Sequence, residues 1–411
     1  MSAPPQTARP GPLSGMRIVE IGVWHAGPGG TAILADLGAE VIKVEGLSGD
    51  PERYQGSFGP MATQAIDTAD WSLMFEMSNR GKKGICVDLR QEAGREVVFD
   101  LLRTADALVT NLRLETIRSF GLDHASVAEI NPKLVTVHAS GFGAAGPAAG
   151  HGAFDTLGQA VSGMMYLAGQ SEPRPLSVIV LDQMTAICVS HAVLTGLLAR
   201  ERHGTADDVQ VSLFGSAVWL MHANLLTSSV LGETFDISWD RTRQSPLRTT
   251  FECSDGAWIA DTNHPEVQYW GRFCDAIGLP ELADDPRYRT PASRKANAAE
   301  LYAVIDAAFR TRTRADWLET GRKHGLLFAP VNTFSDVLKD EQARANGYVV
   351  DREHPRLGQV TMPGYPAVFA QHDVGPAGPA PTLGQHTDDV LSALGYPAAT
   401  LERLRADGVI A

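Results

Sequence analysis

Asp182 is the residue in this sequence whose type and position best suit covalent chemistry. It follows the apolar run PLSVIVL and stands at the start of a long helical pattern that continues to about Arg202. An aspartate in this position is typical of a helix N-cap, which is a purely structural role. The position also suits catalysis, because the positive end of a helix stabilises the ionised carboxylate that a nucleophile needs. The sequence leaves both roles open, and they can coexist.

Six basic side chains, most of them close to the ends of predicted strands, are candidates for holding the phosphates of a ligand. They are Arg80, Lys82, Lys83, Arg90, Arg113 and Arg118. Charge scattered over a solvated surface explains the same pattern. The residue types alone do not decide between these interpretations.

Residues 27–32 (GPGGTA) match the GxGxxA form of a dinucleotide-binding turn, and Glu45 follows as a possible ribose ligand. The match is weak, because residues 23–26 separate the first glycine from the preceding strand and Pro28 favours a helix start. We interpret the segment as a tight turn that opens a helix. The N-terminus of that helix could still face a phosphate.

Several classes of site and partner are disfavoured. The sequence holds no HExxH or GxSxG motif, and its four cysteines show no CxxC spacing, so we expect no metal centre, serine triad or disulfide framework. With 48 acidic against 35 basic residues, the net charge of -13 disfavours nucleic acid and anionic membranes as partners. No run approaches the about 18 apolar residues of a membrane span. Residues 1–12 are predicted to be flexible, and we expect a cytoplasmic protein.

Short apolar runs alternate with helical patterns along the chain. We predict strands at residues 16–22, 40–45, 84–89, 107–111 and 134–140, and helices at residues 30–37, 91–103 and about 159–202. This alternation predicts a parallel, doubly wound α/β sheet with ligands at the carboxyl ends of its strands. Two short strands within residues 249–260 indicate a second, smaller α+β domain. The Pro- and Gly-rich residues 358–384 predict an extended return path before a short helix at residues 387–394.

Many motifs follow one another in a fixed order over almost the whole chain. They are residues 12–22 (PLSGMRIVEIG), 26–45 (AGPGGTAILADLGAEVIKVE), 49–53 (GDPER), 79–90 (NRGKKGICVDLR), 105–113 (ADALVTNLR), 130–147 (INPKLVTVHASGFGAAGP), 154–163 (FDTLGQAVSG), 181–182 (LD), 283–297 (ADDPRYRTPASRKAN), 329–333 (APVNT) and 383–396 (LGQHTDDVLSALGY). Together they resemble the family III CoA-transferases, which include formyl-CoA and carnitine CoA-transferases and share their fold with α-methylacyl-CoA racemases.

The resemblance implies an open, Rossmann-like α/β large domain built from both chain ends, a small domain from the middle, and an interlocked homodimer. We place the large domain at residues 13–215, the linker and small domain at residues 216–328, and the return segment at residues 329–411. By position, Asp182 resembles the family's catalytic aspartate. The positions that resemble the family's CoA contacts are His25, Ala26, Val87, Arg90, Asn111, Arg113, Gly152, Phe154 and Asp155.

The function that the resemblance implies is the transfer of CoA from an acyl-CoA donor to a free carboxylic acid. An aspartyl anhydride and an aspartyl-CoA thioester would form in turn on Asp182, with CoA and acyl-CoA as substrates and no permanently bound cofactor. A carboxylate suits this chemistry, because an anhydride keeps the acyl group activated through both exchanges.

Departures from the family's pattern leave alternatives open. Gly46 replaces a frequent basic residue, and residues 110–115 read TNLRLE instead of ENFRPG, so the phosphate contacts can differ. Phe154 stands where racemase relatives have a catalytic histidine, although His151 lies nearby. An acyl-CoA racemase is therefore the second hypothesis, and a non-catalytic acyl-CoA-binding protein is the third.

Overall fold

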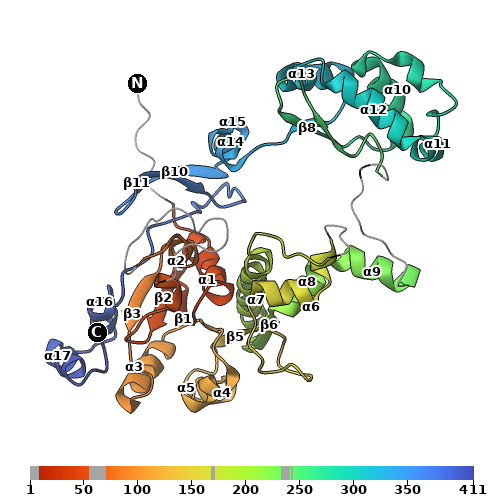
Figure 1. The fold of residues 1–411 in the computed structure, drawn as a ribbon. Coiled ribbons are helices and arrows are strands. Elements are labelled where there is room, and N and C mark those ends of the chain that lie inside the picture. Colours follow the sequence, from red (N-terminus) through yellow and green to blue (C-terminus); the bar gives the residue numbers. More distant parts are fainter. Residues whose placement is uncertain (1–8, 55–70, 168–171, 233–240, 242–243) are drawn as a thin grey trace, which may run out of the picture. The chain divides into compact units, whose positions relative to one another are not determined.

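A computed structural model describes residues 9–54, 71–167, 172–232, 241 and 244–411. Residues 1–8 of the segment predicted to be flexible lie outside the described residues. The chain forms two compact units, of which the first comprises Met1–Tyr166, Glu172–Phe235 and Asn346–Ala411 and the second Leu167–Ser171 and Asp236–Ala345 (Figure 1). The return to the first unit thus comes at Asn346, later than the boundary at residue 329 expected from the sequence. The reason is that β9 (Phe328–Pro330) pairs with β8 (Trp258–Asp261) in the second unit.

The first unit is built on a six-stranded parallel sheet with the order β3-β2-β1-β4-β5-β6. Its strands are β1 (Arg17–Ile21), β2 (Glu40–Glu45), β3 (Lys83–Cys86), β4 (Ala107–Thr110), β5 (Val135–Ser140) and β6 (Asp208–Ser212). The strand order reverses direction between β1 and β4, and this switch point is where open α/β sheets bind ligands. The predicted parallel α/β sheet is confirmed. We did not predict β6, because this edge strand is only partly buried and lacks a continuous apolar run.

Helices cover both faces of the sheet, so the side chains of each strand alternate between two cores. Val19 and Ile21 face the core formed with α3 (Glu92–Leu102) and with the C-terminal helices α16 (Thr387–Ala393) and α17 (Ala398–Ala406). Ile18 faces the opposite core, formed with α1 (Ala26–Asp36) and α7 (Val180–His203). Both chain ends therefore contribute to one doubly wound unit (Figure 1).

The glycine-rich segment at residues 27–32 packs α1 against α7. A Cβ on Gly30 would lie 2.6 Å from Cγ1 of Val189, and a Cβ on Gly29 would lie 3.0 Å from Cβ of Ala186. These glycines permit close helix packing, which explains the motif without a dinucleotide. Helix α7 is also the one described helix that is long and apolar enough to cross a membrane, with a mean hydropathy of 1.3. Half of that stretch is buried inside the protein, as in the core helix of a globular unit.

The other elements complete the two units. In the first unit these are α2 (Leu73–Asn79), α4 (Leu114–Ser119), α5 (His124–Ile130), α6 (Asp155–Val161), α8 (Leu213–Leu220), α9 (His222–Leu231) and the antiparallel hairpin of β10 (Val349–His354) and β11 (Gly358–Pro363). In the second unit, β7 (Thr250–Glu252), β8 and β9 form an antiparallel sheet beside α10 (Glu266–Ile277), α11 (Pro291–Ala296), α12 (Ala298–Phe309), α13 (Arg314–His324), α14 (Phe334–Lys339) and α15 (Glu341–Ala345). An aromatic core around Phe251, Phe273 and Phe309 holds the second unit together.

Candidate active site

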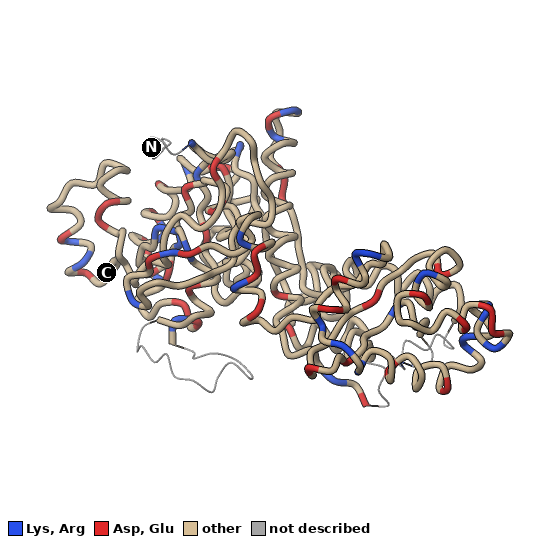
Figure 2. Tube along the Cα trace, turned by 90° about the horizontal axis from the view of Figure 1, so that it is seen from above, with Lys and Arg blue, Asp and Glu red and all other residues tan. Residues whose placement is uncertain are grey.

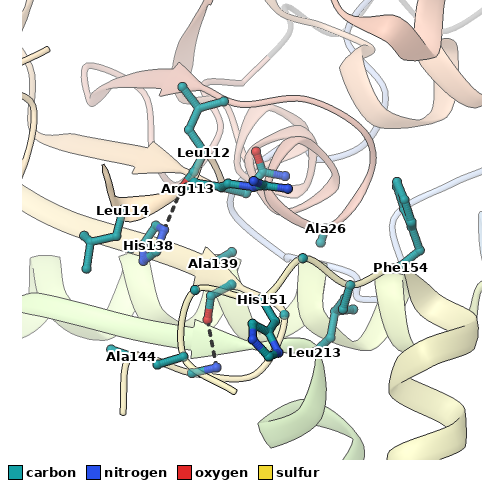
Figure 3. A pocket seen from close by; sticks show the side chains of 18 of the residues that line it. Ala26, Leu112, Arg113, Leu114, His138, Ala139, Ala144, His151, Phe154 and Leu213 are labelled. Atoms are coloured by element: carbon teal, nitrogen blue, oxygen red, sulfur yellow. Dashed lines mark hydrogen bonds between the residues drawn. The ribbon is translucent and has the colours of Figure 1, made fainter. Parts of the chain in front are cut away.

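A cavity of about 740 Å³ lies in the first unit at the carboxyl ends of β1, β4 and β5. Its walls come from the loops that follow these three strands and from the starts of the helices beyond them (Figure 3). The lining residues are Val23, Trp24, Ala26, Asn111, Leu112, Arg113, Leu114, Glu115, Arg118, His138, Ala139, Ser140, Gly141, Gly143, Ala144, Ala149, Gly150, His151, Gly152, Ala153, Phe154, Leu157, Asp182 and Leu213. The cavity thus occupies the switch point of the sheet, where the parallel fold predicts a ligand site.

Asn111 ties the loop after β4 to the loop after β1. Its Nδ2 donates to the carbonyl oxygen of Val23 at 2.6 Å, and its Oδ1 accepts from the backbone N–H of Val23 at 2.9 Å. Trp24, which follows Val23, has a φ of 63°, in the left-handed region that bulky side chains rarely adopt. Its ring packs edge-on against Phe154 at 5.5 Å between centroids. Two loops and two aromatic rings therefore shape one wall of the cavity.

His25 is buried and is not part of the cavity lining. Its Nδ1 is 2.8 Å from Oγ of Ser78, and its Nε2 is 2.9 Å from Oε1 of Gln183. Burial lowers the pKa of His25 to about 4, so the ring is neutral near pH 7. The neighbouring Ala26 does line the cavity. His25 therefore connects α1 and α2 with the first turns of α7, beside Asp182.

Asp182 belongs to the first turn of α7 and lines the cavity. Its side chain is partly buried. Burial, and secondly the negative charge of Asp155, raise the pKa of Asp182 to about 7. The carboxylate therefore exchanges its proton near neutral pH, a property typical of functional sites.

Asp155 is buried and does not line the cavity. Its Oδ2 accepts hydrogen bonds from the backbone N–H groups of Leu181 at 2.7 Å and of Asp182 at 3.1 Å. Gly152 and Phe154, immediately before it, line the cavity. The structure thus brings the four positions 152, 154, 155 and 182 together, but it gives Asp155 a partner in α7.

Only two of the six basic candidates, Arg113 and Arg118, line the cavity. Figure 3 shows Arg113 among the lining side chains. The other four have acidic partners: Arg80 bonds to Asp36, Lys82 to Glu20, Lys83 to Glu40 and Arg90 to Asp88. Arg90 is an exposed side chain outside the cavity lining, and Val87 at the end of β3 is fully buried. Figure 2 shows basic and acidic residues interspersed along both units. Arg113 and Arg118 are therefore a local basic pair in the cavity wall, whereas basic and acidic residues are interspersed over the rest of the protein.

His138 and Ser140, which the sequence did not single out, form part of the cavity wall at the end of β5. Nε2 of His138 is 2.9 Å from the carbonyl oxygen of Leu112 (Figure 3). Oγ of Ser140 accepts from the N–H of Gly143 at 3.0 Å. These contacts fix the loops after β4 and β5. The sequence offered one signal for these two residues, because both are polar and lie at the carboxyl end of a predicted strand. Among the described residues, no three His, Cys, Asp or Glu side chains are grouped to hold a metal ion.

Comparisons with known proteins agree with this architecture. The model of "CoA-transferase family III" matches residues 13–387. A succinyl-CoA:glutarate CoA-transferase of Mus musculus is 31% identical over 97% of this chain and 90% of its own length. An (R)-2-hydroxy-4-methylpentanoate CoA-transferase of Clostridioides difficile is 28% identical over 97% of this chain and 99% of its own.

A solved structure shows the same fold. The crystal structure of a CAIB/BAIF family protein from Brucella suis superposes with a TM-score of 0.82 at 30% identity, covering 94% of this chain and 100% of that one. The sequence match extends over most of the chain and includes the whole of the cavity wall. This protein is a member of CoA-transferase family III.

Proposed function

We propose that this protein transfers CoA from an acyl-CoA thioester to a free carboxylic acid, with the carboxylate of Asp182 as the nucleophile. The observation that carries the proposal is the position of Asp182 on the wall of a cavity at the sheet's switch point, at the start of α7. A carboxylate with a pKa of about 7 is sufficiently basic to attack a thioester and is still ionised in part at neutral pH.

The reaction needs only the carboxylate, the thiolate and the acids. A carboxylate oxygen of Asp182 attacks the thioester carbonyl, the C–O bond forms, and the C–S bond breaks to release CoA thiolate. The thiolate attacks the aspartyl carbonyl of the anhydride, which gives an aspartyl-CoA thioester and frees the donor acid. The acceptor carboxylate attacks this thioester, and a second anhydride and the thiolate form. Attack of the thiolate on the acyl carbonyl gives the new acyl-CoA and restores Asp182.

Water competes with each attack, so the cavity must limit its access. Trp24, Phe154, Leu157 and Leu213 supply apolar surface to the wall that also holds Asp182. The rings of Trp24 and Phe154 contact each other edge-on. These side chains are suited to excluding water from an anhydride on Asp182.

The pKa of Asp182 predicts the pH dependence of the first step. Because the nucleophile is the ionised form, acyl transfer to Asp182 should rise with pH, reach half its maximum near pH 7 and level off above that value. Stopped-flow or quenched-flow measurement of CoA release in a single turnover gives this profile. A half-maximum near pH 4, the usual range for an aspartate, would show that Asp182 is not perturbed.

We propose that Arg113 and Arg118 bind the phosphates of CoA, because they are the two basic candidates in the cavity wall. Removal of a charge-assisted phosphate contact should weaken binding by about tenfold or more. Calorimetry should therefore show this loss of CoA affinity in Arg113→Ala. The matched control is Arg103→Ala, whose side chain pairs with Asp100 outside the cavity. Equal affinities of the two variants would exclude Arg113 as a phosphate ligand.

We propose that the protein is an interlocked homodimer. Helix α9 has no buried residue, although it carries large apolar side chains such as Leu226, Val230 and Leu231. Trp219 of α8 is likewise 68% exposed. Apolar surface of this kind is typical of a face that a second subunit covers. Light scattering should give twice the chain mass of 44.1 kDa, and a single-chain mass would contradict the proposal.

A second candidate function is acyl-CoA racemisation, which one observation favours: His151 lines the cavity and could exchange a proton in place of the histidine absent at Phe154. Incubation of a 2-methylacyl-CoA in D₂O distinguishes the two functions. A racemase would introduce deuterium at the α-carbon without an acceptor acid.

The test of the proposed function is a panel of acyl-CoA donors crossed with free acids. Succinyl-CoA and acetyl-CoA are offered with glutarate, oxalate and branched 2-hydroxy acids, the acids named for relatives of this chain. Mass spectrometry should detect a new thioester that forms only with both partners present. A protein that binds CoA but forms no new thioester with any pair would instead be the non-catalytic binding protein.

A further inference from the structure

Helix α7 begins without a cap of its own. Its N-cap residue, Ile179, has no side-chain oxygen to accept from the N–H groups of the first turn. The N–H groups of Leu181 and Asp182, at the second and third helical positions, donate instead to Oδ2 of Asp155. These two positions are the ones that an N-cap side chain normally serves. Asp155 therefore caps α7 from another helix.

Gln159 extends this contact to the segment that leads into α7. It lies one turn after Asp155 on α6, and its Nε2 donates to Oδ1 of Asp155 at 2.5 Å. Its Oε1 accepts from the backbone N–H of Leu176 at 2.8 Å. Gln159 is 1% exposed. Both carboxylate oxygens of Asp155 thus accept hydrogen bonds. Helix α6 therefore holds both the first turn of α7, through Asp155, and the segment before α7, through Gln159.

A direct contact between Asp155 and CoA fits these observations less well. Asp155 is 7% exposed, it is not part of the cavity wall, and N–H groups occupy its two oxygens. Gly152 and Phe154, by contrast, reach the cavity. The carboxylate of residue 155 faces away from the ligand space and toward the backbone that carries Asp182.

We propose that Asp155 is a positioning residue, which together with Gln159 fixes the first turn of α7 and so places the Asp182 carboxylate in the cavity. The proposal rests on the proposed function, because it concerns the nucleophile of that reaction. The arrangement has an electrostatic consequence as well. The charge of Asp155 opposes ionisation of Asp182, so the same contact that orders the nucleophile also raises its pKa.

The kinetic test compares Asp155→Asn and Asp155→Ala with the unchanged protein, using an active pair from the donor panel. Asparagine keeps one acceptor oxygen and the shape of the side chain, whereas alanine leaves the N–H groups of the first turn without a partner. We expect kcat to fall about tenfold in Asp155→Asn and about 100-fold in Asp155→Ala, because small displacements of a reacting group have effects of this size. The KM for acyl-CoA and the Kd for CoA should stay within about threefold. The acid limb of the pH profile should move to lower pH in Asp155→Asn.

The matched control is Asp123→Asn. Asp123 caps α5 through the N–H of Ser126, and it is not in the cavity wall. This control makes the same chemical change at another helix start, so kcat and the pH profile should not change. A weakened CoA affinity with an unchanged kcat in Asp155→Asn would overturn the proposal and make Asp155 a CoA ligand.

Hydrogen exchange gives a readout that does not depend on turnover. Peptides that cover residues 176–186 should exchange faster in Asp155→Ala and Gln159→Leu, and at the original rate in Asp123→Asn. Unchanged protection in Asp155→Ala and Gln159→Leu would refute the cap. If Asp155→Ala does not fold, Gln159→Leu decides alone. If the unchanged protein forms no adduct on Asp182, the proposed nucleophile fails, while exchange and CoA affinity still decide whether Asp155 caps α7.

Discussion

Asp182→Asn is expected to lower the rate of thioester exchange by at least about 10³-fold, with CoA affinity retained. The amide keeps the size of the side chain and its place in the first turn of α7, but it cannot form the anhydride. Losses of this order are typical when a covalent nucleophile is removed. The measurement is the initial rate of new thioester formation, together with the Kd of CoA. Asp207→Asn, a change in an exposed loop outside the cavity, is the control and should keep the full rate.

The same variant should be more stable than the parent above neutral pH. The folded protein raises the pKa of Asp182 from 3.8 to about 7, so folding favours its protonated form. Stability from this group is complete below pH 4 and is lost as the pH rises toward 7. An asparagine does not ionise. After allowance for partial solvent exposure, the free energy of unfolding of Asp182→Asn should exceed that of the parent by about 1–2 kcal/mol at pH 8 and should equal it at pH 4. Denaturation by urea at both pH values measures this gain, and equal stability at pH 8 would contradict the raised pKa.

Lys43→Met is expected to destabilise the first unit by about 3–5 kcal/mol. Nζ of Lys43 is fully buried and bonds to Glu20 at 2.8 Å, to Asp50 at 3.0 Å and to the carbonyl oxygen of Gly22 at 3.0 Å. Methionine fills the space of the lysine side chain but removes the positive charge that pairs with two buried carboxylates. The loss of these buried ion pairs accounts for the size of the effect. Urea denaturation gives the free energy of unfolding.

The control for this change is Lys83→Met, on the neighbouring strand β3. Lys83 pairs with Glu40 in an exposed contact, and such pairs contribute about 0–1 kcal/mol. The difference between the two variants therefore isolates the effect of burial. If Lys43→Met and Lys83→Met lower the free energy of unfolding by the same amount, the buried network does not stabilise the fold.

This network also supports the cavity wall. Although burial raises the pKa of Glu20, Lys43 and Lys82 together lower it to about 2, so the carboxylate stays ionised. Lys82 bonds in addition to the carbonyl oxygen of Pro28 in α1, while Lys43 holds that of Gly22. The charges thus hold Gly22 and Pro28 on either side of Trp24 and Ala26, the two residues that this segment brings to the cavity. Lys82 is a structural residue, which the sequence could not distinguish from a phosphate ligand.

The central strands could be predicted from the sequence because they are buried on both faces. The runs at residues 16–22 and 40–45 are rich in Val and Ile and match β1 and β2 closely. The edge strand β6 and the hairpin of β10 and β11 were missed, because their half-exposed sequences do not differ from those of loops. The helix predicted at residues 159–202 is interrupted in the structure, where α7 begins only at Val180.

The parallel fold by itself predicts the site only to the level of its edge of the sheet, where the loops after β1, β4 and β5 meet. The positions Ala26, Asn111 and Arg113, which line the cavity, came from the resemblance to the family. The hydrogen-bond partners of the buried polar groups could not be predicted from the sequence. The bond from Leu181 to Asp155 spans 26 residues, and no local pattern indicates it. For the same reason, the buried setting of His25 became visible only in three dimensions.

The most direct test of the account is a search for a covalent adduct on the nucleophile. The protein is incubated with an acyl-CoA from an active pair, treated with hydroxylamine, digested and analysed by peptide mass spectrometry. A hydroxamate is expected on Asp182, in an amount that depends on acyl-CoA, and none is expected in Asp182→Asn. Turnover without any adduct at residue 182, or with an adduct at another carboxylate, would contradict it.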